Sequence, residues 1–155
     1  MCVGFFLGCM FVSETYSIDD CYWIETGSTI SGMYSSSGGT LTLNDGVFSL
    51  TKGSGTSYFY LNVPKTNLPI TDFVNKELTV KTDVIEFGGT NLRLTLVYND
   101  GSSWSTGIIK DITTTGLLEQ SINIPSNATQ VRIRFDISGN ENDSIQFKDF
   151  RLLLS

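Results

Sequence analysis

The sequence contains no histidine, and this absence removes much of the common chemistry of enzyme sites. Ser-His-Asp and Cys-His catalysis and histidine-ligated metal sites are all excluded. Charged residues are also few, at 17% of the 155 residues, and the 16 acids outnumber the 10 bases to give a net charge of −6. Because nucleic-acid and anionic-membrane binders need a basic face, neither partner is expected.

Basic residues are missing altogether from the first third of the chain, where Lys52 is the first. Residues 1–51 hold five acids and no base, whereas the other 104 residues hold 11 acids and 10 bases. The negative charge therefore gathers at the N-terminal end of an otherwise nearly neutral chain. No spacing marks two of the acids as a glycosidase pair, so we expect no catalytic residues and no enzyme activity.

The N-terminal run of residues 1–12, MCVGFFLGCMFV, carries no charge. It lacks the basic leader of a signal peptide and is shorter than the ~20 apolar residues of a membrane span. We predict an arm or first strand over residues 1–17, preceding a domain over residues 18–155. The arm either packs into the core or mediates assembly with further copies of the chain or with virion proteins. The odd set of Cys2, Cys9 and Cys21 predicts buried thiols rather than a disulfide framework.

What the sequence does contain is alternation with a period of two residues. In Gln130–Ile137, the apolar side chains fall on one face and Arg132, Arg134 and Asp136 on the other. Asp45-Gly46 stands between two alternating runs, which is the strongest short signal for a hairpin with a type I′ turn. Alternation bounded by Gly, Asn, Asp and Ser is typical of β-strands.

The pattern predicts an all-β protein, a two-sheet antiparallel β-sandwich with about eight to ten strands. Shifts of phase near Val84-Ile85 and Lys148-Asp149 indicate irregular pairing, such as a β-bulge, in two of them. A helical turn is expected only within residues 70–76, and residues 35–39 read as a flexible loop. The clearest strands are expected over residues 40–43, 47–50, 57–63, 78–87, 92–98, 117–124, 130–137 and 144–154.

The order of these segments also resembles a known family. A Leu-Arg-Leu-Thr-Leu-Val-Tyr strand and a polar hairpin precede a strand ended by Pro125. A Thr-Gln-Val-Arg-Ile-Arg-Phe segment follows, and the last strand carries Asp149 before Phe-Arg-Leu. Over residues 18–155 this is similar to the galactose-binding-like jelly rolls that include many bacterial carbohydrate-binding modules. The resemblance implies a non-catalytic jelly roll that holds sugars against aromatic rings on one sheet face or its edge loops.

Aromatic and arginine side chains are the candidates for holding such a sugar. Aromatic rings stack on the apolar face of a pyranose, and an arginine fork can grip hydroxyls or a carboxylate. The alternative is that the rings pack the sheet and that the arginines pair with acids on neighbouring strands. The candidate ligand-binding residues are Tyr58, Tyr60, Asn62, Trp104, Trp23, Tyr34, Arg132 and Arg134.

The resemblance also implies a structural calcium ion where the last strand meets the N-terminal strand. Asp19, Asp20, Glu25 and Asp149 are the candidate metal ligands, because calcium takes oxygen donors. The alternative is that these acids are ordinary surface residues. The family usually has a pair of aspartates before its final apolar run, whereas Asp149 stands alone here.

Two functions therefore remain open. The first is a non-catalytic module that recognises a glycan or cell-surface polysaccharide through surface aromatics. The second is a virion structural or attachment protein, such as a tail, baseplate, capsid-decoration or spike component, that uses the same fold for assembly and host-surface binding. Either would act on a virion or at an extracellular or cell surface.

Overall fold

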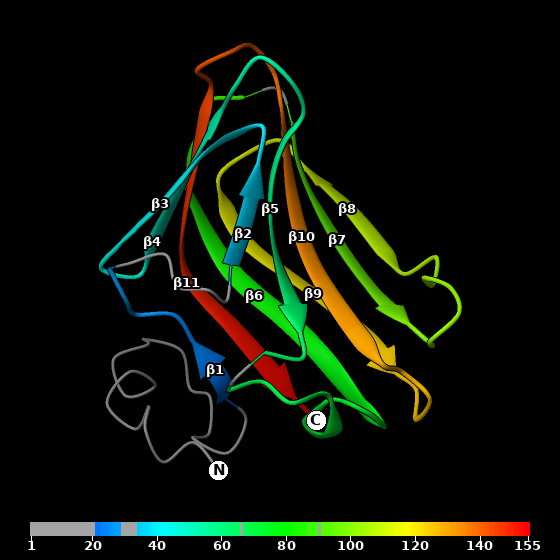
Figure 1. Ribbon diagram of the computed structural model, residues 1–155. Coiled ribbons are helices and arrows are strands. Elements are labelled where there is room, and N and C mark those ends of the chain that lie inside the picture. Colours follow the sequence, from blue (N-terminus) through cyan, green and yellow to red (C-terminus); the bar gives the residue numbers. More distant parts are fainter. Residues whose placement is uncertain (1–20, 29–33, 66, 90) are drawn as a thin grey trace.

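The computed structural model describes residues 21–28, 34–65, 67–89 and 91–155, and these residues form two facing β-sheets (Figure 1). The first sheet contains β1 (Cys21–Ile24), β3 (Gly39–Asn44), β4 (Val47–Lys52), β6 (Lys76–Phe87), β9 (Gly116–Ile124) and β11 (Ser144–Leu154). The second contains β2 (Tyr34–Ser37), β5 (Ser57–Val63), β7 (Asn91–Asn99), β8 (Ile108–Ile112) and β10 (Gln130–Ser138).

Both sheets are antiparallel throughout. The six-stranded sheet runs β3-β4-β11-β6-β9, with β1 paired to the second half of β11, and the five-stranded sheet runs β2-β5-β10-β7-β8. One 3₁₀ turn, Ile70–Asp72, precedes β6 and falls within the range where a helical turn was predicted. The two-sheet antiparallel β-sandwich predicted from the alternation is confirmed. No helix in the described ranges is long and apolar enough to cross a membrane.

Phenylalanine side chains from both sheets meet between them. Phe59 and Phe135 of the five-stranded sheet stack nearly parallel, with ring centroids 5.1 Å apart and an interplanar angle of 4°. Phe48 and Phe147 of the other sheet stack on each other at 5.1 Å and on Phe59 at 5.4 Å. All four side chains are fully buried, so this phenylalanine cluster joins the sheets at their centre.

The predicted turn and bulges lie where the sequence placed them. Asp45 and Gly46 both have positive φ, 47° and 74°, which the type I′ hairpin between β3 and β4 requires. In the pairing of β11 with β6, the register shifts opposite Ile85 and again between Lys148 and Arg151. These irregularities explain the changes of phase in both strands.

Two expectations need correction. Residues 35–39 are not a loop, because Tyr34–Ser37 pairs with β5 and Gly39 begins β3. With β1 and β2 included, the described residues form eleven strands rather than eight to ten. The arm predicted over residues 1–17 lies outside the described residues, as do Cys2 and Cys9.

The phenylalanine cluster makes a stability prediction. Phe135→Ala removes a fully buried ring that touches its neighbours in both sheets, and it should lower the free energy of unfolding by about 3–5 kcal/mol. Leu117→Ala, at a side chain that is 53% exposed, should change it by less than about 0.5 kcal/mol. Urea unfolding of both variants measures the difference, and equal losses would contradict the central role of the cluster.

Candidate functional site

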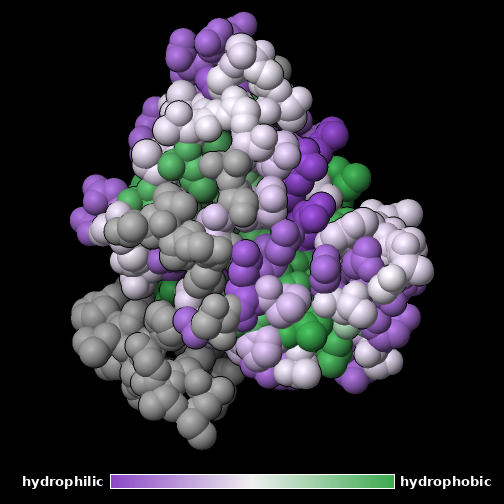
Figure 2. All heavy atoms as spheres, in the orientation of Figure 1, coloured by the Kyte–Doolittle hydropathy of each residue, from purple (hydrophilic) through white to green (hydrophobic). Residues whose placement is uncertain are grey.

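The alternation in β5, β7 and β10 divides their side chains between the core and one exposed surface. Phe59, Leu61 and Ile133 are fully buried, while their neighbours along each strand point away from the other sheet. We call this surface of the five-stranded sheet the outer face, and in Figure 2 hydrophilic side chains run across it. Its members on these strands include Tyr58, Tyr60, Asn62, Arg93, Thr95, Arg132, Arg134 and Asp136.

At one end of the outer face, Arg132 is stacked against two aromatic rings. Its guanidinium carbon lies 4.3 Å from the ring centroid of Trp104 and 5.4 Å from that of Tyr60. Its Nε–H donates a hydrogen bond to Oδ1 of Asn62, the residue opposite it on β5, over 2.9 Å. Trp104 reaches this position from the hairpin after β7 and keeps 37% of its surface exposed. A strand pair and a hairpin thus build one aromatic–arginine cluster.

The next arginine along β10 repeats the arrangement with different partners. The guanidinium carbon of Arg134 lies 4.2 Å from the ring centroid of Tyr58, and Nε donates to Oδ1 of Asp136 at 2.9 Å. A second contact, from Nη2, makes this an ion pair. Tyr58 and Tyr60 stack along β5 with their centroids 5.8 Å apart. The rings and guanidinium groups therefore form a continuous row along the sheet.

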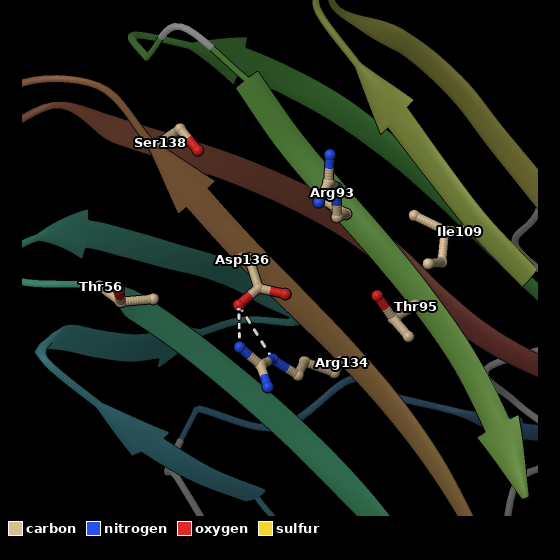
Figure 3. Close-up of a pocket in the computed structure, with 7 residues that line it drawn as sticks. All are labelled: Thr56, Arg93, Thr95, Ile109, Arg134, Asp136 and Ser138. Carbon is tan, nitrogen blue, oxygen red and sulfur yellow. Dashed lines mark hydrogen bonds and ion pairs between the residues drawn. The ribbon is translucent and has the colours of Figure 1, made fainter. Parts of the chain in front are cut away.

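Beyond this row the surface is hollowed into an open pocket of about 400 Å³ (Figure 3). Strands β7, β8 and β10 supply most of its lining, together with the residue just before β5. Hydroxyl, guanidinium and carboxylate groups face the same space, so the pocket offers both hydrogen-bond donors and acceptors. The lining residues are Thr56, Arg93, Thr95, Ile109, Arg134, Asp136 and Ser138.

A bidentate ion pair connects β7 with β8 beside the pocket. Nε and Nη2 of Arg93 donate to Oδ1 and Oδ2 of Asp111 over 2.7 and 3.2 Å, and Asn91 donates to Oδ1 over 3.1 Å. The hydrogen bonds from Arg93, and then from Asn91, lower the pKa of Asp111 from 3.8 to about 2. This carboxylate stays ionised at any ordinary pH and holds the Arg93 guanidinium in place.

Six of the eight predicted ligand-binding residues come together on or beside the outer face, and two do not. Trp23 and Tyr34 are only 7% and 5% exposed, so their rings do not lie open at the surface for a sugar to stack on. Tyr34 packs edge-on against Phe48 and donates its hydroxyl to Glu25. Burial, and then the hydrogen bond to Glu25, raise the pKa of this hydroxyl. Both aromatics therefore belong to the core.

The pocket was not predicted from the sequence, although the alternation of two strands indicated that some of its lining residues face outward. Arg93 and Thr95 stand at the outward positions of an alternating strand, and Asp136 was already assigned to the outward face of β10. Ile109 and Asp111 had no such signal, because the exposed strand β8 does not alternate clearly. Their proximity to Thr95 and Arg93 depends on the register between β7 and β8.

The calcium site stays a prediction. Asp19 and Asp20 lie outside the described residues, and the described ones hold no group of three or more acidic, cysteine or histidine side chains placed so that they could bind a metal ion. The backbone N–H of Glu25 donates to the carbonyl of Phe150, next to Asp149, so the last strand does meet the N-terminal strand here. The Glu25 carboxylate accepts hydrogen bonds from the Gly27 backbone and from Tyr34.

Comparisons with known proteins support the fold. No protein-family model matches the sequence, and no curated protein matches it significantly. Among solved structures, a bacteriophage CBA120 tailspike protein matches with a TM-score of 0.59 and 13% identity, over 83% of this chain but only 21% of the tailspike. The Clostridium thermocellum xylanase 10B, with its CBM22 and GH10 modules, matches with a TM-score of 0.65 and 14% identity. The match covers 89% of this chain and 29% of the enzyme.

An isolated module matches over nearly its whole length. A xylan-binding domain from CBM22 matches with a TM-score of 0.58 and 14% identity, over 89% of this chain and 97% of its own. The fold is therefore the jelly roll of carbohydrate-binding modules, as the resemblance implied. At these identities the likeness concerns the fold.

The ion pair beside the pocket makes a titration prediction. Replacing Arg93 by glutamine removes the largest cause of the lowered pKa, so the pKa of Asp111 should rise from about 2 toward its ordinary 3.8. The pKa of Asp100 is also about 2, but through hydrogen bonds from Ser103 and Ser102, and should not move. NMR titration of the carboxyl groups compares the two, and an unmoved Asp111 would show that Arg93 is not what holds its charge.

Proposed function

We propose that this protein is a non-catalytic carbohydrate-binding module and that a glycan lies along the outer face. The observation that carries the proposal is the row of Trp104, Tyr60 and Tyr58, which is interleaved with Arg132 and Arg134 and ends in an open pocket. Large, partly exposed rings in line with fixed polar groups suit a ligand that has both apolar faces and many hydroxyls.

The geometry favours a chain of sugars over a single ring. From Arg132 to Asp136, the outward side chains of β10 extend over about 13 Å at ~3.3 Å per residue, and the Trp104 hairpin lies at the Arg132 end. Sugar rings would stack on Trp104 and on Tyr58, while Thr95, Ser138 and the arginines would hydrogen-bond to the hydroxyl groups of the sugars. The arginines are already held by stacking and by hydrogen bonds, so binding costs less side-chain entropy.

The charge states of the acids argue for binding without catalysis. A glycosidase needs a carboxyl group with a raised pKa to act as general acid. On this surface Asp136 is paired with Arg134, and Arg93 lowers the pKa of Asp111 to about 2. The xylan-binding modules among the structural neighbours are consistent with the proposal. A module of this kind would act outside the cell or at a cell surface. Purified protein should release no sugars from a polysaccharide that it binds.

The aromatic row makes the first binding prediction. On a glycan array, followed by calorimetry on the best ligand, Trp104→Ala and Tyr60→Ala should each weaken binding by about tenfold or more, or ~1.4 kcal/mol. Ile85→Ala serves as a control, because Ile85 is 40% exposed but lies on the other sheet, and it should bind like the wild type. A wild-type protein that binds no glycan, or one whose binding survives both aromatic variants, would refute the proposal.

A virion structural or attachment protein remains a second candidate, and the match to the phage tailspike domain favours it. In that setting the outer face would still be open to a host-surface polysaccharide. The uncharged run of residues 1–12 would supply the contact with further copies of the chain or with virion proteins, because an apolar segment outside the core must be covered by something.

The second candidate has its own test. Size-exclusion chromatography with light scattering should show a trimer or larger ring for the full chain and a monomer when residues 1–12 are deleted. Circular dichroism of the shortened chain must show an intact β-sandwich for the comparison to count. A full chain that is monomeric at high concentration would remove this role for residues 1–12.

A further inference from the structure

The three arginines of the outer face differ in how their charges are balanced. Arg93 is bound in bidentate fashion by Asp111, and Arg134 is paired with Asp136. Arg132 has Asn62, Trp104 and Tyr60 as its neighbours, and within the described residues no carboxylate pairs with it. Asp136 and Asp111 are already held by the other arginines, and the carboxylate of Asp100, in the hairpin of Trp104, accepts hydrogen bonds from Ser102 and Ser103.

The stacking of Arg132 leaves its best hydrogen-bonding groups open. The guanidinium carbon lies 4.3 Å from the ring centroid of Trp104 and 5.4 Å from that of Tyr60, and the N–H donors point outward in the plane of the guanidinium group. Nε–H is used by Asn62, and among the described residues the Nη groups find no acceptor. A stacked, oriented guanidinium with open in-plane donors is well arranged to bind an anion in bidentate fashion.

In the part of the chain that the structure describes, the lack of an acidic partner for Arg132 is notable, because the chain has an excess of acids. The chain has 16 acids and 10 bases, so an arginine is easily supplied with an acid partner. The neighbouring outward positions instead hold the amide of Asn62 and aromatic rings. An unbalanced positive charge is therefore kept at the aromatic end of a face where the other two arginines are balanced.

We propose that Arg132 recognises an anionic group on the sugar that stacks at Trp104, so that the ligand is an acidic glycan. The group is a carboxylate, as in a uronic acid, or a sulfate ester, since both present oxygen pairs that match the guanidinium fork. This inference rests on the proposed function, because it concerns the ligand of the same face. The other outer-face arginines keep the row fixed, and Arg132 selects for charge.

The test compares polysaccharides that differ only in their anionic groups. Polygalacturonate is measured against its carboxyl-reduced form, and κ-carrageenan against its desulfated form, with xylan as a neutral reference. We expect the wild type to bind at least one charged polymer about tenfold more tightly than its neutral counterpart, a difference of ~1.4 kcal/mol. The preference should shrink as salt is raised, because an exposed ion pair is screened. The two pairs of polymers distinguish carboxylate from sulfate.

Matched arginine variants assign the effect to one residue. Arg132→Gln should abolish the preference, so that the charged polymer and its neutral form bind with the same affinity. Arg134→Gln should keep the preference, because that charge is already offset by Asp136. Arg132→Lys keeps the charge but loses the planar fork, so it should fall between the wild type and Arg132→Gln. Circular dichroism and thermal unfolding confirm that each variant is folded.

The outcomes separate this inference from the proposal on which it rests. Equal binding of charged and neutral polymers would overturn the role of Arg132 and leave the carbohydrate-binding function standing. A preference for charge that survives Arg132→Gln would also overturn it. Binding that is confined to neutral glycans would overturn the role of Arg132 as well. Binding of none of these polymers and of no glycan on the array would overturn the proposed function itself.

Discussion

The stacking of phenylalanine rings between the two sheets is the interaction on which the rest of the structure depends. Phe59 and Phe135 come from neighbouring strands of one sheet, and Phe48 and Phe147 from neighbouring strands of the other. With these rings buried, every second residue of β5 and β10 must point away from the core. The positions of Tyr58, Tyr60, Arg132 and Arg134 thus follow from hydrophobic packing on the opposite side of the same strands.

Much of this arrangement could be read from the sequence, because β5, β7 and β10 alternate cleanly. The prediction failed where alternation is weak or absent. Residues 35–39 look like a polar loop, yet the backbone of Tyr34–Ser37 completes the edge of the sheet next to β5. Trp23 and Tyr34 were expected to be displayed, but no local signal distinguishes a core aromatic on a short strand from an exposed one. The pocket depends on cross-strand register between β7 and β8, which is a long-range property.

The outer face also shows how few charges can organise a polar surface. Each of its arginines is fixed by partners on its own strand, a neighbouring strand or the hairpin after β7: Asp111 for Arg93, Asp136 and Tyr58 for Arg134, and Asn62, Tyr60 and Trp104 for Arg132. Because these contacts exist before any ligand arrives, the surface is preorganised. Its rings keep the apolar area that a sugar face needs, while the fixed guanidinium groups define where hydrogen bonds can form.

The two-residue period of these strands assigns alternate residues to two different roles, core packing and the outer face. In β5 and β10 the odd-numbered positions from Phe59 and Val131 onward are buried, and the even-numbered positions form the outer face. In β7 the parity is reversed, with Leu92, Leu94 and Leu96 in the core. Substitutions at outer-face positions leave the core packing untouched, so most should cost little stability. The outer-face residues can therefore be changed, by engineering or by evolution, to alter the binding specificity while the core residues of the same strands stay as they are.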